Sequence, residues 1–526
     1  MNLRNNLQKY FGYETFRNIQ EKIVEDALLN KNQLIVLPTG SGKSICYQLP
    51  SLLSDKLTII ISPLKSLIKD QISNLKKKNL ESVGFYGDSK LKEKEFIIQN
   101  MLKDSRNFNM IYTTPETLLS NILFIENLDS LYENNKIGRF VIDEAHCISL
   151  WGNDFRSSYK ELNFLKIKYP NVPLMFLTAT ATPKVKKDIM YIMKIKNFES
   201  YTISYYRSNL NIIVNKRNSN KETSTKIENL IKNKYLDKSG IIYCQSRKKC
   251  DNLKELLLSK GIICDTYHAG MTTKNRNSSQ ENWKTSKTKV IIATIAFGMG
   301  VDKNDVRYII HFNMPSSIEN YYQEIGRGGR DGIDCECYLY YSYQDKVIME
   351  KMLRQNKQGI KNEKYINYQI TKLNMMINYC ENIIDCRHCQ ISNYLGDKMK
   401  DNCLKNCNNC LNNDNISKLD ITLTANTLFN IIMQLSSNSN KTNIKNQFKK
   451  STNYYELLKK FKTQKKVFEI FQRILIFLII NKYVKEVLER TDFGFWIEKY
   501  KLFKKCRDIM VKKEKLFIPI CESDLM

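Results

Sequence analysis

Short apolar runs rich in β-branched residues alternate with longer stretches of helical periodicity between residues 30 and 200. This alternation is typical of a parallel sheet flanked by helices, because its strands are buried on both faces. The strands are expected at 57–61, 110–112, 140–142 and 174–177. A second set of runs predicts another α/β domain. Its strands are expected at 240–243, 290–293 and 308–312, and the polar segment 217–225 is expected to be the linker.

The pattern changes after residue 341 to helices, a group of cysteines and an Asn-rich stretch at 402–415. The remaining residues are strongly basic. Their periodicity predicts helices at 452–460 and 467–480, followed by two strands at 484–488 and 495–500. These changes predict four domains. Their boundaries are expected at 1–207, 208–343, 344–414 and 415–526.

The chain of 526 residues carries a formal charge of +29, spread along its length rather than gathered in one tail. Such a distribution suits a long groove that follows the phosphates of a nucleic acid. The alternative is a general bias in composition, since Lys, Asn and Ile are all heavily used.

No apolar run approaches the roughly 18 residues of a membrane span, and the longest, 474–480, is expected to be a buried helix core. The N-terminus has no apolar signal region. The 15 cysteines are therefore expected to be reduced thiols, in the nucleus or the cytoplasm, and no membrane partner is expected.

A glycine-rich loop follows the apolar run 34–37. Its glycines allow successive backbone N–H groups to point at phosphate oxygens. Lys43 is predicted to neutralise the β- and γ-phosphates, and Ser44 to offer its hydroxyl to Mg²⁺. Leu37 stands where the strict pattern has Gly. The predicted nucleotide-binding residues of the loop are Pro38, Thr39, Gly40, Ser41, Gly42, Lys43 and Ser44.

Two carboxylates follow the apolar run 140–142. Asp143 is predicted to complete the Mg²⁺ site, and Glu144 is predicted to orient and deprotonate the attacking water. A Gly-Lys-Ser triplet alone is a weak signal. With a carboxylate pair behind a second strand, the sequence predicts a nucleoside triphosphatase rather than a chance surface turn.

An arginine segment at 323–332 lies in the second α/β domain. Arg327 and Arg330 stand three residues apart between glycines. We expect them to reach across a cleft as arginine fingers and to stabilise charge in the transition state, by about 10³-fold or more in rate. Because they lie on the opposite domain, hydrolysis requires closure. The sequence therefore predicts a motor that opens and closes.

Together these motifs resemble the RecQ family of superfamily 2 DNA helicases, over nearly the whole chain. The resemblance implies ATP as the nucleotide, with Tyr13 and Arg17 flanking adenine and Gln20 reading its edge. It also implies translocation 3′→5′ on single-stranded DNA. Gly328 stands where the family usually has Ala. Further matching segments are 62–64, 112–116, 178–180, 242–244, 246–247, 268–271, 293–294, 297–300, 302–303 and 321–324.

The segment after the carboxylate pair separates RecQ proteins from other DEAH-box enzymes. Its aromatic side chains, Trp151 and Phe155, are expected to stack on bases, with Arg156 beside them on the DNA. The alternative is that both aromatics are plain core residues. Leu150 and Asn153 stand where the family usually has Gln and His, so the coupling of DNA to ATP is expected to differ.

Four cysteines have the spacing C-x₁₆-C-x₃-C-x₂-C, which suits tetrahedral Zn²⁺ in a structural site. They are Cys386, Cys403, Cys407 and Cys410. The surrounding residues resemble the zinc subdomain of the family, in which the Cys before Arg387 is the first ligand. Cys380, Cys389 and His388 are rival ligands.

Residues 418–510 resemble, more loosely, the winged-helix module that follows this zinc site in the family. Basic charge on such a module indicates duplex binding, and the alternative is a solvated helix face. Phe493, in the short turn between the two strands, is predicted to stack on the end base pair. A further C-terminal helical module found in many relatives is expected to be absent.

The expected fold is α/β: two tandem RecA-like P-loop domains, a small helical zinc-binding subdomain and a C-terminal winged-helix domain. The expected function is ATP-dependent DNA unwinding with Mg²⁺ and Zn²⁺, on single-stranded and duplex DNA, in repair, recombination or replication. The sequence identifies no protein partner. The alternatives are a DEAH-type RNA helicase, and a DNA-binding or annealing protein with a vestigial ATPase.

Overall fold

The computed structural model describes residues 2–152, 154–298, 303–355, 363–399, 401–412, 416–491, 495–512 and 514–521. The chain forms two compact units. Unit 1 contains Met1–Tyr341 and His388–Asp401, and unit 2 contains Ser342–Arg387 and Asn402–Met526. Among the helices of these described ranges, none is long and apolar enough to cross a membrane.

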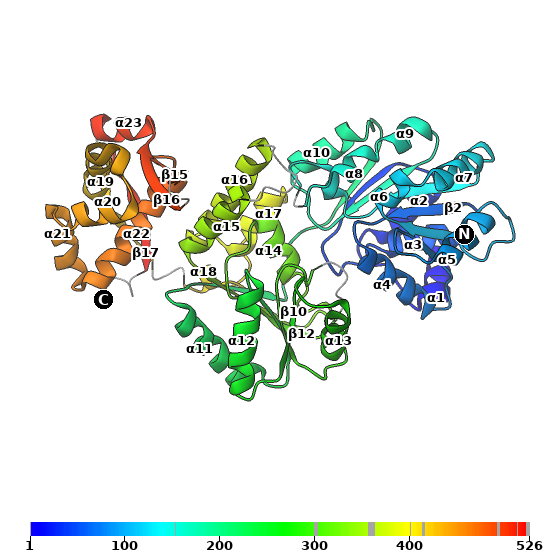
Figure 1. Cartoon of the computed structure of the whole chain (residues 1–526), viewed down its shortest axis with the longest axis horizontal. Helices are drawn as coiled ribbons and strands as arrows, with labels where there is room; N and C mark the ends of the chain where they lie inside the picture. Colours follow the sequence, from blue (N-terminus) through cyan, green and yellow to red (C-terminus); the bar gives the residue numbers. More distant parts are fainter. Residues whose placement is uncertain are drawn as a thin grey trace. The chain divides into compact units, whose positions relative to one another are not determined.

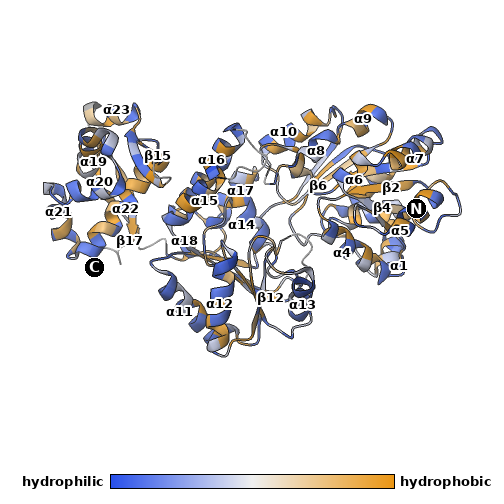
Figure 2. Cartoon of the chain, in the orientation of Figure 1, coloured by the Kyte–Doolittle hydropathy of each residue, from blue (hydrophilic) through white to orange (hydrophobic). Residues whose placement is uncertain are grey.

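Lobe 1, the first part of unit 1, is a seven-stranded sheet in which all neighbouring strands are parallel. In sheet order the strands are β3 (Val83–Phe85), β4 (Met110–Thr113), β2 (Leu57–Ile61), β5 (Ile137–Ile142), β6 (Leu174–Thr178), β1 (Gln33–Val36) and β7 (Glu199–Thr202). The four predicted strands are β2, β4, β5 and β6. They are almost wholly buried, and the apolar colour of β2, β4 and β6 is visible in Figure 2.

Helices flank this sheet (Figure 1). They are α1 (Leu3–Phe11), α2 (Gln20–Leu28), α3 (Ile45–Leu52), α4 (Lys65–Lys76), α5 (Leu91–Asn100), α6 (Pro115–Ser120), α7 (Ile122–Glu133), α8 (Ser157–Glu161), α9 (Phe164–Lys168) and α10 (Pro183–Ile192). A 3₁₀ turn, η1 (Ala145–Ile148), follows β5 after two intervening residues. The loops that follow β1 and β5 lie at the carboxyl edge of the sheet, where α/β proteins bind ligands.

Lobe 2 is a six-stranded parallel sheet. In sheet order its strands are β10 (Cys264–Tyr267), β11 (Val290–Ala293), β9 (Ser239–Tyr243), β12 (Val306–His311), β13 (Cys335–Tyr341) and β8 (Leu210–Lys216). Its helices are α11 (Asn220–Leu230), the π-helical turn η2 (Ile231–Tyr235), α12 (Arg247–Ser259), α13 (Thr273–Lys284) and α14 (Ile318–Ile325). The three strands predicted for this domain are β9, β11 and β12. All but the first residue of α17 (Arg387–Leu395) also belongs to unit 1.

The prediction of a linker at 217–225 is wrong. The strand β8 precedes this segment and already belongs to the second sheet, where it pairs with β13. The segment itself runs into α11, whose first turn is capped by Ser219 accepting a hydrogen bond from the Glu222 backbone N–H at 3.1 Å. Its polar composition is therefore that of a capped helix start on the surface rather than of a connection between domains.

Unit 2 begins with the long helices α15 (Tyr343–Gln355) and α16 (Glu363–Glu381) and contains the short helix α18 (Asn408–Leu411). A basic module follows, whose helices are α19 (Thr422–Leu435), η4 (Ser436–Asn438), α20 (Lys441–Phe448), α21 (Thr452–Phe461), α22 (Gln464–Ile480) and α23 (Lys505–Lys512). Two antiparallel pairs complete it, β14 (Ile416–Asp420) with β17 (Phe517–Cys521) and β15 (Val484–Arg490) with β16 (Trp496–Leu502).

The predicted helices and hairpin of this module are confirmed as α21, α22, β15 and β16. The apolar run 474–480 lies in α22, which supplies Ile474, Leu475 and Leu478 to one buried core. The same core takes Val484 and Tyr500 from the hairpin β15–β16. This hairpin is called the wing hairpin below.

Candidate nucleotide site, DNA contacts and metal centre

The glycine-rich loop leaves β1 and enters α3 with two residues in the left-handed backbone region. Gly40 has φ 83° and Gly42 has φ 80°, a region that L side chains rarely adopt. A Cβ on Gly42 would lie 2.5 Å from the Gln20 side-chain nitrogen. Neither position therefore accepts a side chain without rearrangement, and the loop backbone stays free to approach a phosphate.

Lys43 lies against this loop. Its ammonium donates hydrogen bonds to the carbonyl oxygens of Leu37 at 3.0 Å and Pro38 at 3.3 Å. Burial lowers the pKa of Lys43, and the nearby carboxylates Glu144 and Asp143 only partly oppose this effect. An anion bound in the loop would supply the counter-charge that this ammonium lacks.

The carboxylate pair stands at the end of β5. Glu144 has a left-handed backbone with φ 50°, and its N–H donates to Asp143 Oδ1 at 3.0 Å. The Tyr159 hydroxyl donates to the Asp143 carbonyl at 3.0 Å and so holds the backbone of the carboxylate pair in place. Burial raises the pKa of both carboxyls, and for Asp143 the neighbouring Glu144 adds to the rise. A divalent cation would stabilise the ionised forms.

A chain of polar contacts leads from Glu144 into lobe 2. His146 Nδ1 lies 3.3 Å from Glu144 Oε2 and 2.9 Å from Thr178 Oγ1. Thr178 Oγ1 donates in turn to the carbonyl of Thr180, and the amide of Gln323 on α14 donates to Thr180 Oγ1 at 3.1 Å. The two lobes of unit 1 are thus joined beside the carboxylate pair.

The arginine segment is shaped by a residue that the sequence interpretation missed. Arg207 donates three hydrogen bonds to backbone carbonyls of the segment, at Gly326 (3.0 Å), Gly328 (2.9 Å) and Gly329 (2.7 Å). Arg327 is only 8% exposed, and its positive charge lies close enough to oppose the rise in the pKa of Glu144. Arg330 packs on the glycine-rich loop, with its Cγ 3.2 Å from where a Cβ of Gly40 would stand.

The glycine at 328 has a local explanation. A Cβ at this position would lie 2.3 Å from the sulfur of Cys335, the first residue of β13. Cys335 is fully buried, so its sulfur cannot move aside into solvent. The sulfur occupies the space that a methyl group would need, which accounts for the glycine at this position.

One cavity of about 460 Å³ joins these groups, and both lobes line it. From lobe 1 it is lined by Tyr13, Arg17, Thr39, Gly40, Gly42, Lys43, Ser44, Tyr47, Leu67, Asp70, Gln71, Asn74, Asp143, Glu144 and Ala179, and from lobe 2 by Asn304, Gln323, Arg327, Arg330 and Asp331. Sequence reasoning missed the residues of α4 in this wall, because no motif marks them.

Gln20 takes a different position from Tyr13 and Arg17. It is 2% exposed and does not line the cavity. Its amide donates to the carbonyl oxygens of Ser41 at 3.0 Å and Gly42 at 3.1 Å, while its oxygen accepts from the Arg17 backbone N–H at 2.8 Å. In this structure Gln20 therefore braces the glycine-rich loop.

The aromatic segment after η1 packs on α10. Lys184 lies 3.2 Å from the centre of the Trp151 ring, and Ser149 donates to the Asp188 carboxylate at 2.5 Å. Arg156 donates to the Pro63 carbonyl at 2.7 Å. Trp151 and Phe155 are both partly exposed, so neither is a plain core residue. Asn153 lies outside the described residues.

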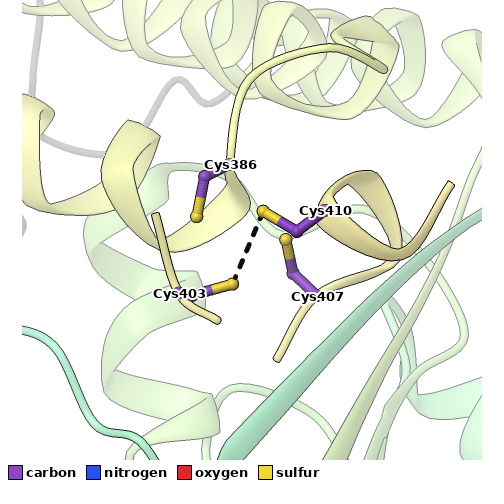
Figure 3. A group of neighbouring side chains, drawn as sticks. All are labelled: Cys386, Cys403, Cys407 and Cys410. Carbon is purple, nitrogen blue, oxygen red and sulfur yellow. Dashed lines mark hydrogen bonds between the residues drawn. The ribbon is translucent and has the colours of Figure 1, made fainter. Parts of the chain in front are cut away.

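The four predicted zinc ligands converge in unit 2. Figure 3 shows the sulfurs of Cys386, Cys403, Cys407 and Cys410 pointing toward one another, and all lie within 4.8 Å of each other. The Arg387 N–H donates to the Cys407 sulfur at 3.4 Å, and the Asn409 amide ties α18 to the carbonyls of Asn382 and Asp385. Four thiols from distant segments at this spacing fit tetrahedral zinc.

The rival ligands are not in this cluster. Cys389 donates instead to the Asp401 carbonyl at 3.5 Å, and the His388 ring packs edge-on against Tyr206. Cys380 is buried in α16. The crowded thiols raise the pKa of Cys403, with its neighbours Cys386 and Cys407 as the largest causes. A metal ion would remove this repulsion by holding the thiolates.

Phe493, the predicted stacking residue, lies outside the described residues. Phe495 lies at the edge of that turn and is 73% exposed. Its backbone N–H donates to the Thr491 hydroxyl at 3.1 Å, and its carbonyl accepts from the Thr491 N–H at 2.7 Å. Thr491 and Phe495 are therefore paired beyond the last strand residues of the wing hairpin, and the Phe495 ring is open to solvent.

Two parallel-sheet lobes with a glycine-rich loop on one and arginines on the other define the ATP-dependent helicase core. Family models agree: DEAD/DEAH box helicase matches residues 17–189, helicase conserved C-terminal domain 222–332, and RecQ zinc-binding 343–411. The chain is 37% identical over 430 residues to the ATP-dependent DNA helicase Q1 of Rattus norvegicus, covering 81% of this chain and 68% of that protein. The chain belongs to the RecQ family of DNA helicases.

A further relative is the RecQ-like DNA helicase BLM of Xenopus laevis, 40% identical over 421 residues and 79% of this chain. This chain spans only 31% of the length of that protein. Among solved structures, the DUF1998 helicase MrfA bound to DNA matches with a TM-score of 0.54 at 18% identity, over 76% of this chain and 59% of that one. That likeness concerns the fold alone.

Proposed function

We propose that this protein is an ATP- and Mg²⁺-dependent DNA helicase of RecQ type, which moves 3′→5′ on single-stranded DNA and unwinds duplexes. The observation that carries the proposal is the single cavity lined by Lys43, Asp143 and Glu144 of lobe 1 and by Arg327 and Arg330 of lobe 2. A nucleotide bound there would contact both lobes, so its hydrolysis would change how the lobes hold together.

The residues take separate roles in this proposal. Lys43 neutralises the terminal phosphates, Ser44 and Asp143 hold Mg²⁺, and Glu144 takes the proton of the attacking water. Arg327 and Arg330 stabilise the charge that develops on the transferred phosphate. Tyr13 and Arg17 line the same cavity and would flank the base. Mg²⁺, when bound, neutralises charge on the phosphate oxygens.

DNA reaches this site through the aromatic segment. Trp151, Phe155 and Arg156 lie downstream of Glu144, and bases stacked on the two aromatics would shift η1 and with it His146. The contacts from His146 through Thr180 to Gln323 would carry that shift to lobe 2. We assign single-stranded DNA to this segment and duplex DNA to the basic module of unit 2.

We assign the domains as 1–207, 208–343, 344–414 and 415–526, and the last as a winged helix. The order of α19, α20, α21 and α22 followed by the wing hairpin supports that assignment. Zinc held by the four cysteines would link the Asn-rich segment 402–415, which carries three of them, to Cys386 just before α17. The expected setting is DNA repair, recombination or replication in the nucleus or cytoplasm.

The test is an unwinding assay that separates the candidate functions. Tailed DNA and RNA duplexes, each with a 3′ or a 5′ single-stranded tail, are incubated with and without ATP. We expect unwinding of the 3′-tailed DNA only, and only with ATP, with Lys43→Ala as the inactive control. Preferred unwinding of RNA would make the protein an RNA helicase, and ATP-independent annealing would make it a DNA-binding protein with a vestigial ATPase.

A further inference from the structure

A cluster of buried charges joins the foot of the wing hairpin to α15. Glu486 lies on β15, and its side chain is 2% exposed. Its Oε2 accepts from Lys346 Nζ at 2.5 Å and from the Tyr343 hydroxyl at 2.8 Å, both on α15. Its Oε1 accepts from the Tyr500 hydroxyl at 3.1 Å, across the hairpin on β16. One carboxylate thus ties both strands of the hairpin to α15.

The α15 side of the cluster balances its own charge. The Lys346 side chain is 3% exposed and lies between two carboxylates, since Glu350 is 2.7 Å away on the next turn of the helix. Arg354 in turn pairs with Glu350 at 2.9 Å. Burial alone lowers the pKa of Lys346, but Glu486 and Glu350 together outweigh it and the pKa is raised. The ammonium therefore stays charged in this environment.

The hairpin is also held on its other side. The backbone N–H of Tyr500 donates to the Ser439 carbonyl at 2.9 Å, and the Ser439 hydroxyl donates to the Tyr500 carbonyl at 2.6 Å. Ser439 is 1% exposed and lies between η4 and α20. The foot of the hairpin is thus clamped between α15 and the body of the basic module.

We propose that Lys346 and Glu486 are positioning residues that fix the wing hairpin to α15, so that the hairpin moves with the helix that follows lobe 2. The chain passes from β13, which ends at Tyr341, into α15, which begins at Tyr343. An ion pair buried this deeply has directional hydrogen bonds, so it specifies one attachment rather than a sliding contact. The consequence for unwinding rests on the proposed helicase function.

The experiment compares two substitutions on α15 in the full-length protein. Lys346→Met leaves Glu486 buried without its cation. Lys351→Met, the control, removes an equal charge from a looser pair. The Lys351 ammonium lies 3.9 Å from the Glu498 carboxylate, and the Lys351 side chain is 26% exposed. Amide hydrogen exchange is measured by mass spectrometry. We expect Lys346→Met to raise exchange at least about tenfold in α15 and the wing hairpin together, with Lys351→Met within about twofold of wild type.

The functional readout is the number of base pairs unwound per ATP hydrolysed. We expect Lys346→Met to lower this ratio about tenfold while ATP hydrolysis stimulated by single-stranded DNA stays within about twofold, because a misplaced hairpin does not touch the nucleotide. A substitution that only destabilised the protein would lower both activities alike. Unchanged exchange in the hairpin would overturn the attachment, and raised exchange with an unchanged ratio would overturn its role in unwinding.

A second variant covers the case in which Lys346→Met does not fold. Glu486→Gln removes the charge and keeps the shape of the side chain. One oxygen remains as an acceptor for a tyrosine hydroxyl, and the other is replaced by an NH₂ group that can donate to the second hydroxyl. We therefore expect the same two changes at a smaller size. Wild-type exchange and coupling in Glu486→Gln would overturn the proposal. If the wild-type protein unwinds no duplex, the proposed function fails, while the exchange measurement still decides whether the hairpin is attached through Lys346.

Discussion

The nucleotide cavity of unit 1 and the foot of the wing hairpin in unit 2 both bury charged side chains, and their charges are balanced in opposite ways. In the cavity, burial lowers the pKa of Lys43 and raises the pKa of Asp143, so each group is shifted toward its neutral form. At the hairpin foot the pKa of Lys346 is raised, toward its charged form. Only in the second cluster do the neighbouring opposite charges outweigh the effect of burial.

This difference separates a binding site from a structural joint. The buried Oε2 atom of Glu144 lies 3.3 Å from His146 Nδ1 but accepts no hydrogen bond among the described residues, whereas both oxygens of Glu486 accept from defined donors. A set of buried charges that is not balanced from within fits a binding site, and the proposed phosphate chain and its metal would supply the missing charges. A complete set has no such need, and its function is to hold two elements together.

The cysteine cluster sharpens the comparison, because its thiols are incomplete without a cation. We expect purified wild-type protein to contain one zinc per chain by elemental analysis. Cys407→Ser is expected to lose the metal and to give unstable or insoluble protein, since metal binding is coupled to folding. Cys389→Ser is the matched control and should keep zinc. Wild-type protein free of metal after purification without chelator would contradict the site.

Removing a cation should have opposite consequences in the two charge clusters. Lys346→Met is expected to lower the free energy of unfolding by about 3 kcal/mol or more, because Glu486 is left buried and unpaired. Lys43→Met in the nucleotide-free protein should leave it unchanged or raise it slightly, because its burial is poorly compensated. Urea unfolding followed by circular dichroism measures both. Equal losses would remove the distinction between the clusters.

Arg327 tests whether lobe 2 completes the cavity. Arg327→Ala is expected to lower DNA-stimulated ATP hydrolysis by about 10³-fold or more, with nucleotide affinity largely kept, because an arginine finger acts mainly on the transition state. Steady-state hydrolysis and binding of a fluorescent ATP analogue separate the two quantities. A large loss of affinity with unchanged turnover would instead make Arg327 a ground-state binder.

Glu144 tests the catalytic part of the same cavity. Glu144→Gln should lower hydrolysis by about 10²-fold or more while ATP still binds, because an amide cannot accept the proton of the attacking water. The same two assays apply. Turnover within about threefold of wild type would show that another group is the base.

The smallest expected effect concerns Glu498, on the rim of the hairpin cluster. Burial, followed by the nearby Glu486, raises the pKa of Glu498 above its ordinary value of 4.5. The folded protein therefore binds the proton more tightly than the unfolded chain, and this group lowers stability as pH rises above that ordinary value. Glu498→Gln should be more stable at pH 7 by less than about 1 kcal/mol, and equal to wild type near pH 4. Urea unfolding at both values tests this.

Much of unit 1 could be predicted because its central strands are continuous apolar runs. The predicted strand 57–61 coincides with β2, and 290–293 coincides with β11. The edge strand β8 is not predicted, since only alternate residues of it are buried and Asn211, Asn215 and Lys216 interrupt its apolar residues. Without β8, the sequence pattern puts the linker at 217–225, after this strand rather than before it.

The candidate sites divide in the same way. The glycine-rich loop, the carboxylate pair and the arginine segment are each a continuous stretch of sequence. The spacing of residues within each stretch therefore indicates its chemistry. Arg207 supports the arginine segment from 119 residues away, and Lys346 meets Glu486 across 140 residues. Such pairs depend on tertiary packing, and no local pattern marks them. The cysteines were an exception, because thiol chemistry and spacing restrict their partners.

The edge of the lobe 2 sheet has a mechanical consequence. The strands β8 and β13 are parallel neighbours, paired from Leu210 with Cys335 through Lys216 with Tyr341. The chain enters lobe 2 at the amino end of β8 and leaves it at the carboxyl end of β13, so tension between these points acts along the strands. A ladder loaded this way yields only in shear, with its hydrogen bonds sharing the force rather than opening one by one. Lobe 2 would therefore resist a pull between its two chain ends with all the hydrogen bonds of this strand pair at once.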